Sequence, residues 1–167
     1  MQKLALENGI DLVIELPVIT ATSSAENFAQ GGVCLLNALG VVSQISFGAE
    51  ANTASDVNLL GRLADFFAFE PPIFQEYLDQ ALKSGCSFPA ARAKAALTCL
   101  QQAKHHSMDS QTLAQFEQLL ASPNNILAIE YMKAIRRHNC KLTPSVVTRT
   151  GAGYHDADTD TALASAS

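Results

Sequence analysis

The chain has 167 residues, of which 48% are hydrophobic and 16% are charged, and its formal net charge is −5 at pH 7. This composition excludes a disordered tail and a basic nucleic-acid-binding arm, and the length suffices for one domain with a sizeable core. The absence of Trp and an aromatic content of 7% argue against a β-sandwich and against a base-stacking platform.

Residues 2–8 have the pattern of a helix end, with Gly9 as its C-cap. Residues 10–16 form a short apolar run, rich in β-branched residues, that ends at Pro17. This run is the strongest strand signal in the sequence, and we expect a β-strand there.

A helix is predicted from Ser23 or Ser24, either of which can cap it, to Leu39. Residues 41–47 predict a second strand, which leads into Gly48. Strand, helix and strand in this order indicate a βαβ unit, so we expect the two strands to be parallel and covered by helices.

The middle of the sequence has a helical pattern of apolar residues, which recur at three- and four-residue spacing. This spacing predicts four helices, at residues 55–69, 72–84, 89–105 and 111–121. We interpret residues 53–121 as a helical insertion packed on a nucleotide-binding α/β core, whose two parts are residues 1–52 and 122–167.

A further helix is predicted from Ser122 to His138, and residues 143–148 predict a third strand that runs into the Gly-rich loop 149–156. The expected fold class is α/β: an incomplete Rossmann-like parallel sheet with a helical insertion.

The four cysteines lack zinc-ligand spacing, so we expect reduced thiols and no metal site. Charged residues interrupt every candidate signal peptide near the N-terminus. The uncharged stretch 27–49 contains Gln, Asn, Ser and four Gly residues, and we interpret it as a buried helix and strand rather than as a membrane span.

In open parallel sheets, ligands bind beyond the carboxyl ends of the strands. Gly48, Asn124, Asn125 and Arg149 hold this position in the predicted fold. A glycine admits a ligand close to the backbone, amides and free helix N–H groups can contact a base edge or a phosphate, and arginine can clamp a phosphate. Each residue also has an ordinary structural explanation. Gly48 can be a turn glycine, Asn124 and Asn125 can be helix caps, and Arg149 can be a surface cation.

The basic residues cluster near the end of the helix predicted at 122–138. Lys133, Arg136 and Arg137 are therefore the local candidates for a contact with an RNA backbone. Cations are also favoured at helix C-termini for their effect on the helix dipole, which is the alternative explanation.

Five ordered motifs carry a resemblance to a known family: residues 8–17 (NGIDLVIELP), 24–33 (SAENFAQGGV), 47–50 (FGAE), 122–131 (SPNNILAIEY) and 151–156 (GAGYHD). Together they resemble the bacterial tRNA(Met) cytidine acetate ligases, a branch of the HxGH nucleotidyltransferase superfamily. The resemblance covers nearly the whole chain except the helical middle.

The resemblance implies a cytoplasmic enzyme that activates acetate with ATP, accompanied by Mg²⁺, to acetyl-adenylate and pyrophosphate. The acetyl group then passes to the wobble cytidine of elongator tRNA(Met). It also implies that Gly48, Asn125 or Asn124, and Arg149 contact ATP, which are the positions that the strand ends indicate.

The sequence departs from the family in lacking the HxGH motif, whose histidines stabilise the phosphates, and it has Ala49 and Ala128 where Ser and Gly are usual. We therefore expect an internal piece of the enzyme that is inactive alone, and we assign no catalytic residue. The alternatives are a non-catalytic RNA-binding or interaction module with the same fold, and a relative that adenylates another small acid.

Overall fold

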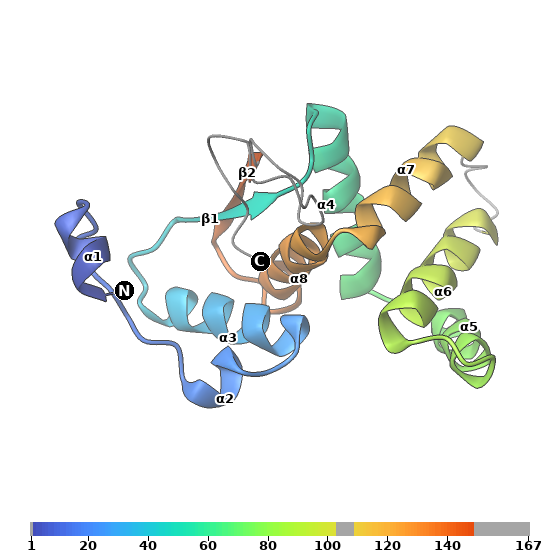
Figure 1. Ribbon diagram of the computed structural model, residues 1–167, viewed down its shortest axis with the longest axis horizontal. Helices are drawn as coiled ribbons and strands as arrows, with labels where there is room; N and C mark the ends of the chain where they lie inside the picture. The colour runs from blue at the N-terminus through green and yellow to red at the C-terminus, as the bar shows by residue number, and fades with distance from the viewer. Residues whose placement is uncertain (1, 103–108, 149–167) are drawn as a thin grey trace, which may run out of the picture.

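Helices make up most of the protein in the computed structural model, which describes residues 2–102 and 109–148 (Figure 1). The elements in chain order are α1 (Gln2–Glu7), α2 (Val18–Ala21), α3 (Ala25–Ala38), β1 (Gln44–Ala49), α4 (Ala54–Ala68), α5 (Pro72–Lys83), α6 (Phe88–Gln102), α7 (Ser110–Ala121), α8 (Pro123–Arg137) and β2 (Thr143–Thr148). None of the helices in these two ranges is long and apolar enough to cross a bilayer.

The sheet that the described residues form has two strands, β1 and β2, which pair in parallel from Gln44 with Thr143 to Ala49 with Thr148. The strand predicted at 143–148 is confirmed. The strand predicted at 41–47 begins three residues later and extends to Ala49, so Gly48 lies inside the strand and not after it. Val41 is 86% exposed, whereas Ile45 and Ala49 are buried, so the strand forms where burial of alternate side chains supports it.

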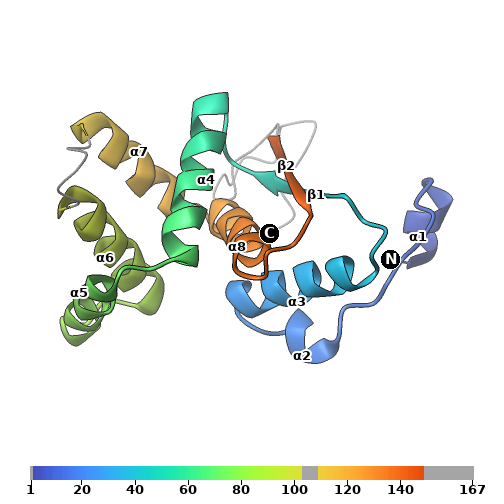
Figure 2. The same ribbon diagram turned by 180° about the vertical axis from the view of Figure 1, so that it is seen from behind.

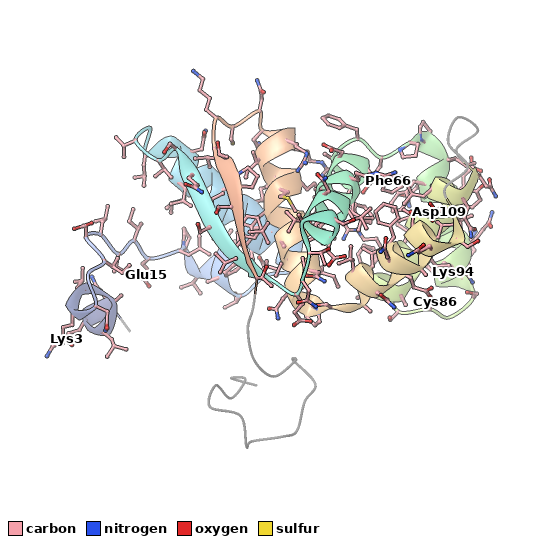
Figure 3. The ribbon with its side chains drawn as sticks, turned by 90° about the horizontal axis from the view of Figure 1, so that it is seen from above. Lys3, Glu15, Phe66, Cys86, Lys94 and Asp109 are labelled. Atoms are coloured by element: carbon pink, nitrogen blue, oxygen red, sulfur yellow. The ribbon has the colours of Figure 1, made fainter. Side chains whose placement is uncertain are left out.

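The strand predicted at residues 10–16 is wrong: these residues form no strand and connect α1 to α2. Ile10, Leu12 and Ile14 are 51%, 66% and 41% exposed. In Figure 3, Glu15 lies on this connection, between α1 and the rest of the molecule. A strand needs a hydrogen-bonded neighbour, and the described residues put none beside this segment. The parallel pair therefore joins the second and third predicted strands, and the first half of the expected βαβ unit is absent from the described structure.

The predicted helices are confirmed within the described residues, where α6 is described as far as Gln102, and several of them begin at a local cap signal. Ser24 accepts a hydrogen bond from the backbone N–H of Asn27 at the start of α3, and Thr53 forms a capping box with Asp56 at the start of α4. Gly9 follows α1 with a φ of +90°, a backbone conformation typical of a C-cap glycine.

Helix α8 is the central element: it packs against α3 on one side, against α4 and α7 on the other, and also against β1. Figure 2 shows α5, α6 and α7 gathered at the end of the molecule opposite α1. One hydrophobic cluster runs from Ala49 at the end of β1 through Phe67 of α4 and Phe74 of α5 to Ile129 of α8. The helical middle thus shares a continuous core with the end of the sheet, while the three-part domain division stays a prediction.

Candidate functional site

A polar junction joins the carboxyl end of β1 to the first turn of α8. The Glu50 carboxylate accepts hydrogen bonds from Ser122 Oγ at 2.8 Å and from Asn124 Nδ2 at 2.7 Å. The backbone N–H of Glu50 donates to Asn125 Oδ1 at 2.8 Å. Three hydrogen bonds between segments more than seventy residues apart therefore fix the start of α8 against the end of the strand.

The sequence of α8 explains why the helix begins at this junction. Ser122 is its N-cap and accepts from the backbone N–H of Asn125 at 3.4 Å, and Pro123 occupies the first helical position. A helix start carries unpaired N–H groups and the positive end of the helix dipole, which favour an anionic group. In this structure the Glu50 carboxylate lies at the helix start, and the junction stands at the edge of the sheet where ligands bind in open parallel folds.

The structure brings three of the four predicted nucleotide-site residues to one edge. Gly48 is exposed near the end of β1, Asn124 is half-buried, and Asn125 is only 2% exposed. The bond from the backbone of Glu50 occupies the Asn125 side-chain oxygen, so its nitrogen is the part that can donate to a ligand. Arg149 lies outside the described residues.

A small polar cavity of about 170 Å³ adjoins the junction. Its lining comprises Glu50, Asn52, Asp56, Gln115, Gln118, Leu119, Ser122 and Asn125. The carboxylate of Asp56 accepts from the backbone N–H groups of Asn52 at 3.1 Å and Thr53 at 2.9 Å. Amide groups, one hydroxyl and the carboxylates of Glu50 and Asp56 line this cavity. Such groups can pair with the donors and acceptors at the polar edge of a base or a ribose. Across residues 2–102 and 109–148, no three His, Cys, Asp or Glu side chains gather as metal ligands.

Glu50 is a residue of this junction that was not predicted from the sequence. Its three hydrogen bonds depend on Ser122, Asn124 and Asn125, which are distant in sequence. The available signal was its place directly after the FGA end of the strand, where a polar side chain reaches the carboxyl edge of the sheet.

The predicted RNA-contact residues form ion pairs within the protein. Lys133 Nζ lies 2.7 Å from Glu26 of α3 and 2.5 Å from Glu130 of α8. Arg92 of α6 lies 2.7 Å from the other oxygen of Glu130, and Arg137 lies 3.3 Å from Glu26. The five side chains alternate in charge and link α8 to α3 and α6; in order they are Arg92, Glu130, Lys133, Glu26 and Arg137. The hydrogen bond from Lys133 holds the pKa of the Glu26 carboxyl below its usual value, against the opposing effect of partial burial.

The three basic side chains differ in their access to solvent. That of Lys133 is 4% exposed, so its ammonium does not face a large partner in this structure. Arg136 is 25% exposed, pairs with Asp65 and donates to the backbone oxygen of Gly61 at 3.2 Å. Arg137 is 42% exposed and is the most accessible of the three.

Comparisons with known proteins agree with this architecture. Residues 2–167 match the sequence profile described as HIGH Nucleotidyl Transferase. The tRNA(Met) cytidine acetate ligase of Clostridium perfringens (strain ATCC 13124) is 46% identical over 154 residues, which are 92% of this chain and 37% of that protein.

Solved structures are similar too. The protein in the crystal structure of Thermotoga maritima TmcAL bound with alpha-thio ATP is 33% identical, with a TM-score of 0.76 over 89% of this chain and 34% of that one. The apo form has a TM-score of 0.78 at 33% identity, over 93% of this chain and 34% of that one. The chain therefore spans little more than a third of the length of these proteins.

Proposed function

This chain belongs to the HIGH Nucleotidyl Transferase family, and from that premise we propose that it forms part of a ligase that acetylates tRNA. The reaction proposed is ATP-dependent activation of acetate to acetyl-adenylate, followed by transfer of the acetyl group to the wobble cytidine of elongator tRNA(Met) in the cytoplasm. The relatives named tRNA(Met) cytidine acetate ligase, at 35% to 46% identity, support this assignment.

The observation that carries the proposal is the polar junction of Glu50 with Ser122, Asn124 and Asn125 at the carboxyl end of β1. A related protein of the same fold was crystallised with an ATP analogue. We assign ATP contacts to Gly48, Asn124, Asn125 and Arg149. In this assignment Glu50 acts as a positioning residue, because it holds both asparagines at the start of α8.

The asparagines and the helix start supply hydrogen-bond donors, and Arg149 supplies a fixed positive charge for the phosphates. Mg²⁺ arrives with ATP in this scheme, because that ion is held mainly by phosphate oxygens and water with few protein ligands. The 167 residues contain no HxGH motif. We therefore assign no catalytic residue and propose that this chain alone does not complete adenylation.

A contact with the tRNA backbone is assigned to Arg137 and Arg136, whose side chains are 42% and 25% exposed. Lys133 is given a structural role because its ammonium is buried between two carboxylates. The alternative of a purely RNA-binding module would depend on the same two arginines, both of which also form ion pairs within the protein.

The proposal is tested by isothermal titration of the chain with ATP and Mg²⁺. Replacing Arg149 with Ala removes a charge-assisted contact and should weaken ATP binding by about tenfold or more. Replacing Lys141, an exposed cation on the loop before β2, with Ala is the matched control and should leave the affinity unchanged. Equal ATP affinity in Arg149→Ala and the unmodified chain would overturn the assignment.

A further inference from the structure

One edge of β1 is open. β2 pairs with the other edge, where the backbone N–H of Thr143 donates to the backbone oxygen of Ser43 at 2.9 Å. Successive peptide groups of a strand point to opposite edges, so the backbone groups of Gln44 and Ser46 point away from β2. In the part of the chain that the structure describes, no segment pairs with them. β1 therefore presents a row of backbone donors and acceptors to which another strand can bond.

The open edge lacks the features by which monomeric proteins protect such edges. Exposed edges usually carry lysine or proline, or a bulge that twists the strand away. β1 has the sequence QISFGA, without a charge or a proline, and it pairs with β2 in a continuous register from Gln44 to Ala49. A sheet of two strands also has little stability by itself. β1 thus has the properties of a strand that a further strand covers.

An apolar groove of about 490 Å³ lies beside this edge. Three segments line it: the connection from α1 to α2, helix α3, and the residues from Val42 to Ser46. The principal lining side chains are Leu12, Ile14, Leu16, Leu36, Val42 and Ile45. None of the described residues that line the groove carries a charge, so two identical copies of this face can approach without repulsion between like charges.

Residues 10–16 have the pattern of a strand that fits this edge. Ile10, Leu12 and Ile14 alternate along the segment and are all exposed, so one side of it is apolar and uncovered. Asp11 and Glu15 occupy intervening positions, which lie on the opposite face of an extended strand. In Figure 3, Glu15 lies on this segment, outside the packed body of the molecule. The segment therefore has an apolar face to bury and no strand partner among the described residues of its own chain.

We propose that two copies of this chain form a symmetric dimer, in which residues 10–16 of each copy add as a strand to the open edge of β1 in the other. The apolar side chains of the added strand enter the groove, and its backbone bonds with the peptide groups of Gln44 and Ser46. Each copy offers both the strand and the edge, which is the self-complementarity that a two-fold interface requires. The uncharged groove has no group that would select an oppositely charged partner instead. This inference goes beyond the proposed function and does not depend on it.

The first test is sedimentation equilibrium of the chain over a range of micromolar concentrations. The molar mass should rise from 17.8 kDa, that of one chain, to twice that value and no further. A mass that stays at 17.8 kDa at the highest concentration would overturn the proposal. Growth beyond the dimer would also overturn it, because a two-fold interface is closed.

Two matched variants locate the interface. Leu12→Glu places a carboxylate in the groove of each partner and should weaken dimerisation by about tenfold or more. Leu4→Glu is the control: Leu4 is on α1, outside the groove, and should leave dimerisation unchanged. Both leucines are 66% exposed, so neither change removes a core side chain, and circular dichroism checks that both variants fold. Equal dimerisation in Leu12→Glu and Leu4→Glu would contradict the proposal.

Amide hydrogen exchange, followed by NMR, separates strand addition from contact through side chains alone. The Ser46 N–H points to the open edge, and in the dimer it should exchange at least about tenfold more slowly than in Leu12→Glu. The Ile45 N–H points to β2 and should be protected in both samples. Exchange of the Ser46 N–H at one rate in the dimer and in Leu12→Glu would overturn the strand pairing.

Discussion

Glu130 is the centre of the ion-pair network, and replacing it with Gln tests that network directly. The carboxylate is 2% exposed and lies 2.7 Å from Arg92 and 2.5 Å from Lys133. Glutamine keeps the shape of the side chain, but it removes the negative charge and turns an N–H₂ group toward one of the two cations. Arg92 and Lys133 then lose a compensating negative charge at a site that water solvates poorly.

The expected loss in the free energy of unfolding follows from the geometry. Removing one partner of a buried ion pair costs about 3–5 kcal/mol. Lys133 keeps its contact with Glu26 at 2.7 Å, and Arg92 keeps its contact with the Phe67 ring. We therefore expect the lower end of that range, about 3 kcal/mol. For a domain of this size the midpoint of thermal unfolding should fall by about 6–12 °C.

The assay is urea unfolding followed by circular dichroism, with Glu76→Gln as the matched control. Glu76 is exposed on α5, so its replacement should change the free energy of unfolding by less than about 0.5 kcal/mol. Replacing Glu130 and Lys133 together with Met removes the pair at the centre of the network and should recover part of the lost stability, because Arg92 still loses its carboxylate partner. A Glu130→Gln chain as stable as the Glu76→Gln control would refute the reasoning.

Three further predictions follow from other contacts. Asn125→Ala removes the buried side-chain oxygen that accepts from the Glu50 backbone N–H and should destabilise the chain by about 1–3 kcal/mol in urea unfolding; an unchanged free energy of unfolding would contradict this role. The lowered pKa of Glu26 means that its ion pair adds stability at neutral pH, and that this stability is lost as the pH falls below about 4.5 through the folded-state pKa. Glu26→Gln should therefore make unfolding less dependent on pH in that acid range, and an unchanged dependence would contradict the pKa direction. Cys34 is exposed, whereas burial raises the pKa of the Cys99 thiol, so a thiol reagent should modify Cys34 in the folded chain and Cys99 only after unfolding.

The helices could be predicted from the sequence because their signals are local. Ser24, Thr53 and Ser122 stand at helix starts, and each accepts a backbone N–H from the first turn. The apolar spacing within each helix repeats every three or four residues and needs no knowledge of distant segments.

The strand predicted at residues 10–16 shows where local signals are insufficient. Its residues favour a strand by type, yet three of its large apolar side chains are more than 40% exposed and it pairs with neither β1 nor β2. Strand propensity describes how a side chain fits a pleated, half-buried surface. It does not supply the neighbouring strand on which such a surface depends.

The sequence predicted that the candidate residues would meet at one edge of the sheet, but it did not predict their contacts. Strand ends and a helix start pointed to Gly48, Asn124 and Asn125, while the role of Glu50 depends on partners more than seventy residues away. Lys133 is a predicted RNA contact because it belongs to the basic cluster of the sequence. It faces inward because its position on α8 meets Glu26 of α3, a contact between distant segments that helical periodicity does not reveal.

The most direct test of the central claim is a crystal structure of this chain soaked with alpha-thio ATP. The account predicts density for the nucleotide at the carboxyl end of β1, with the Asn124 and Asn125 side chains and the Gly48 backbone within hydrogen-bonding or van der Waals contact. Nucleotide density elsewhere, with none at this junction, would contradict it.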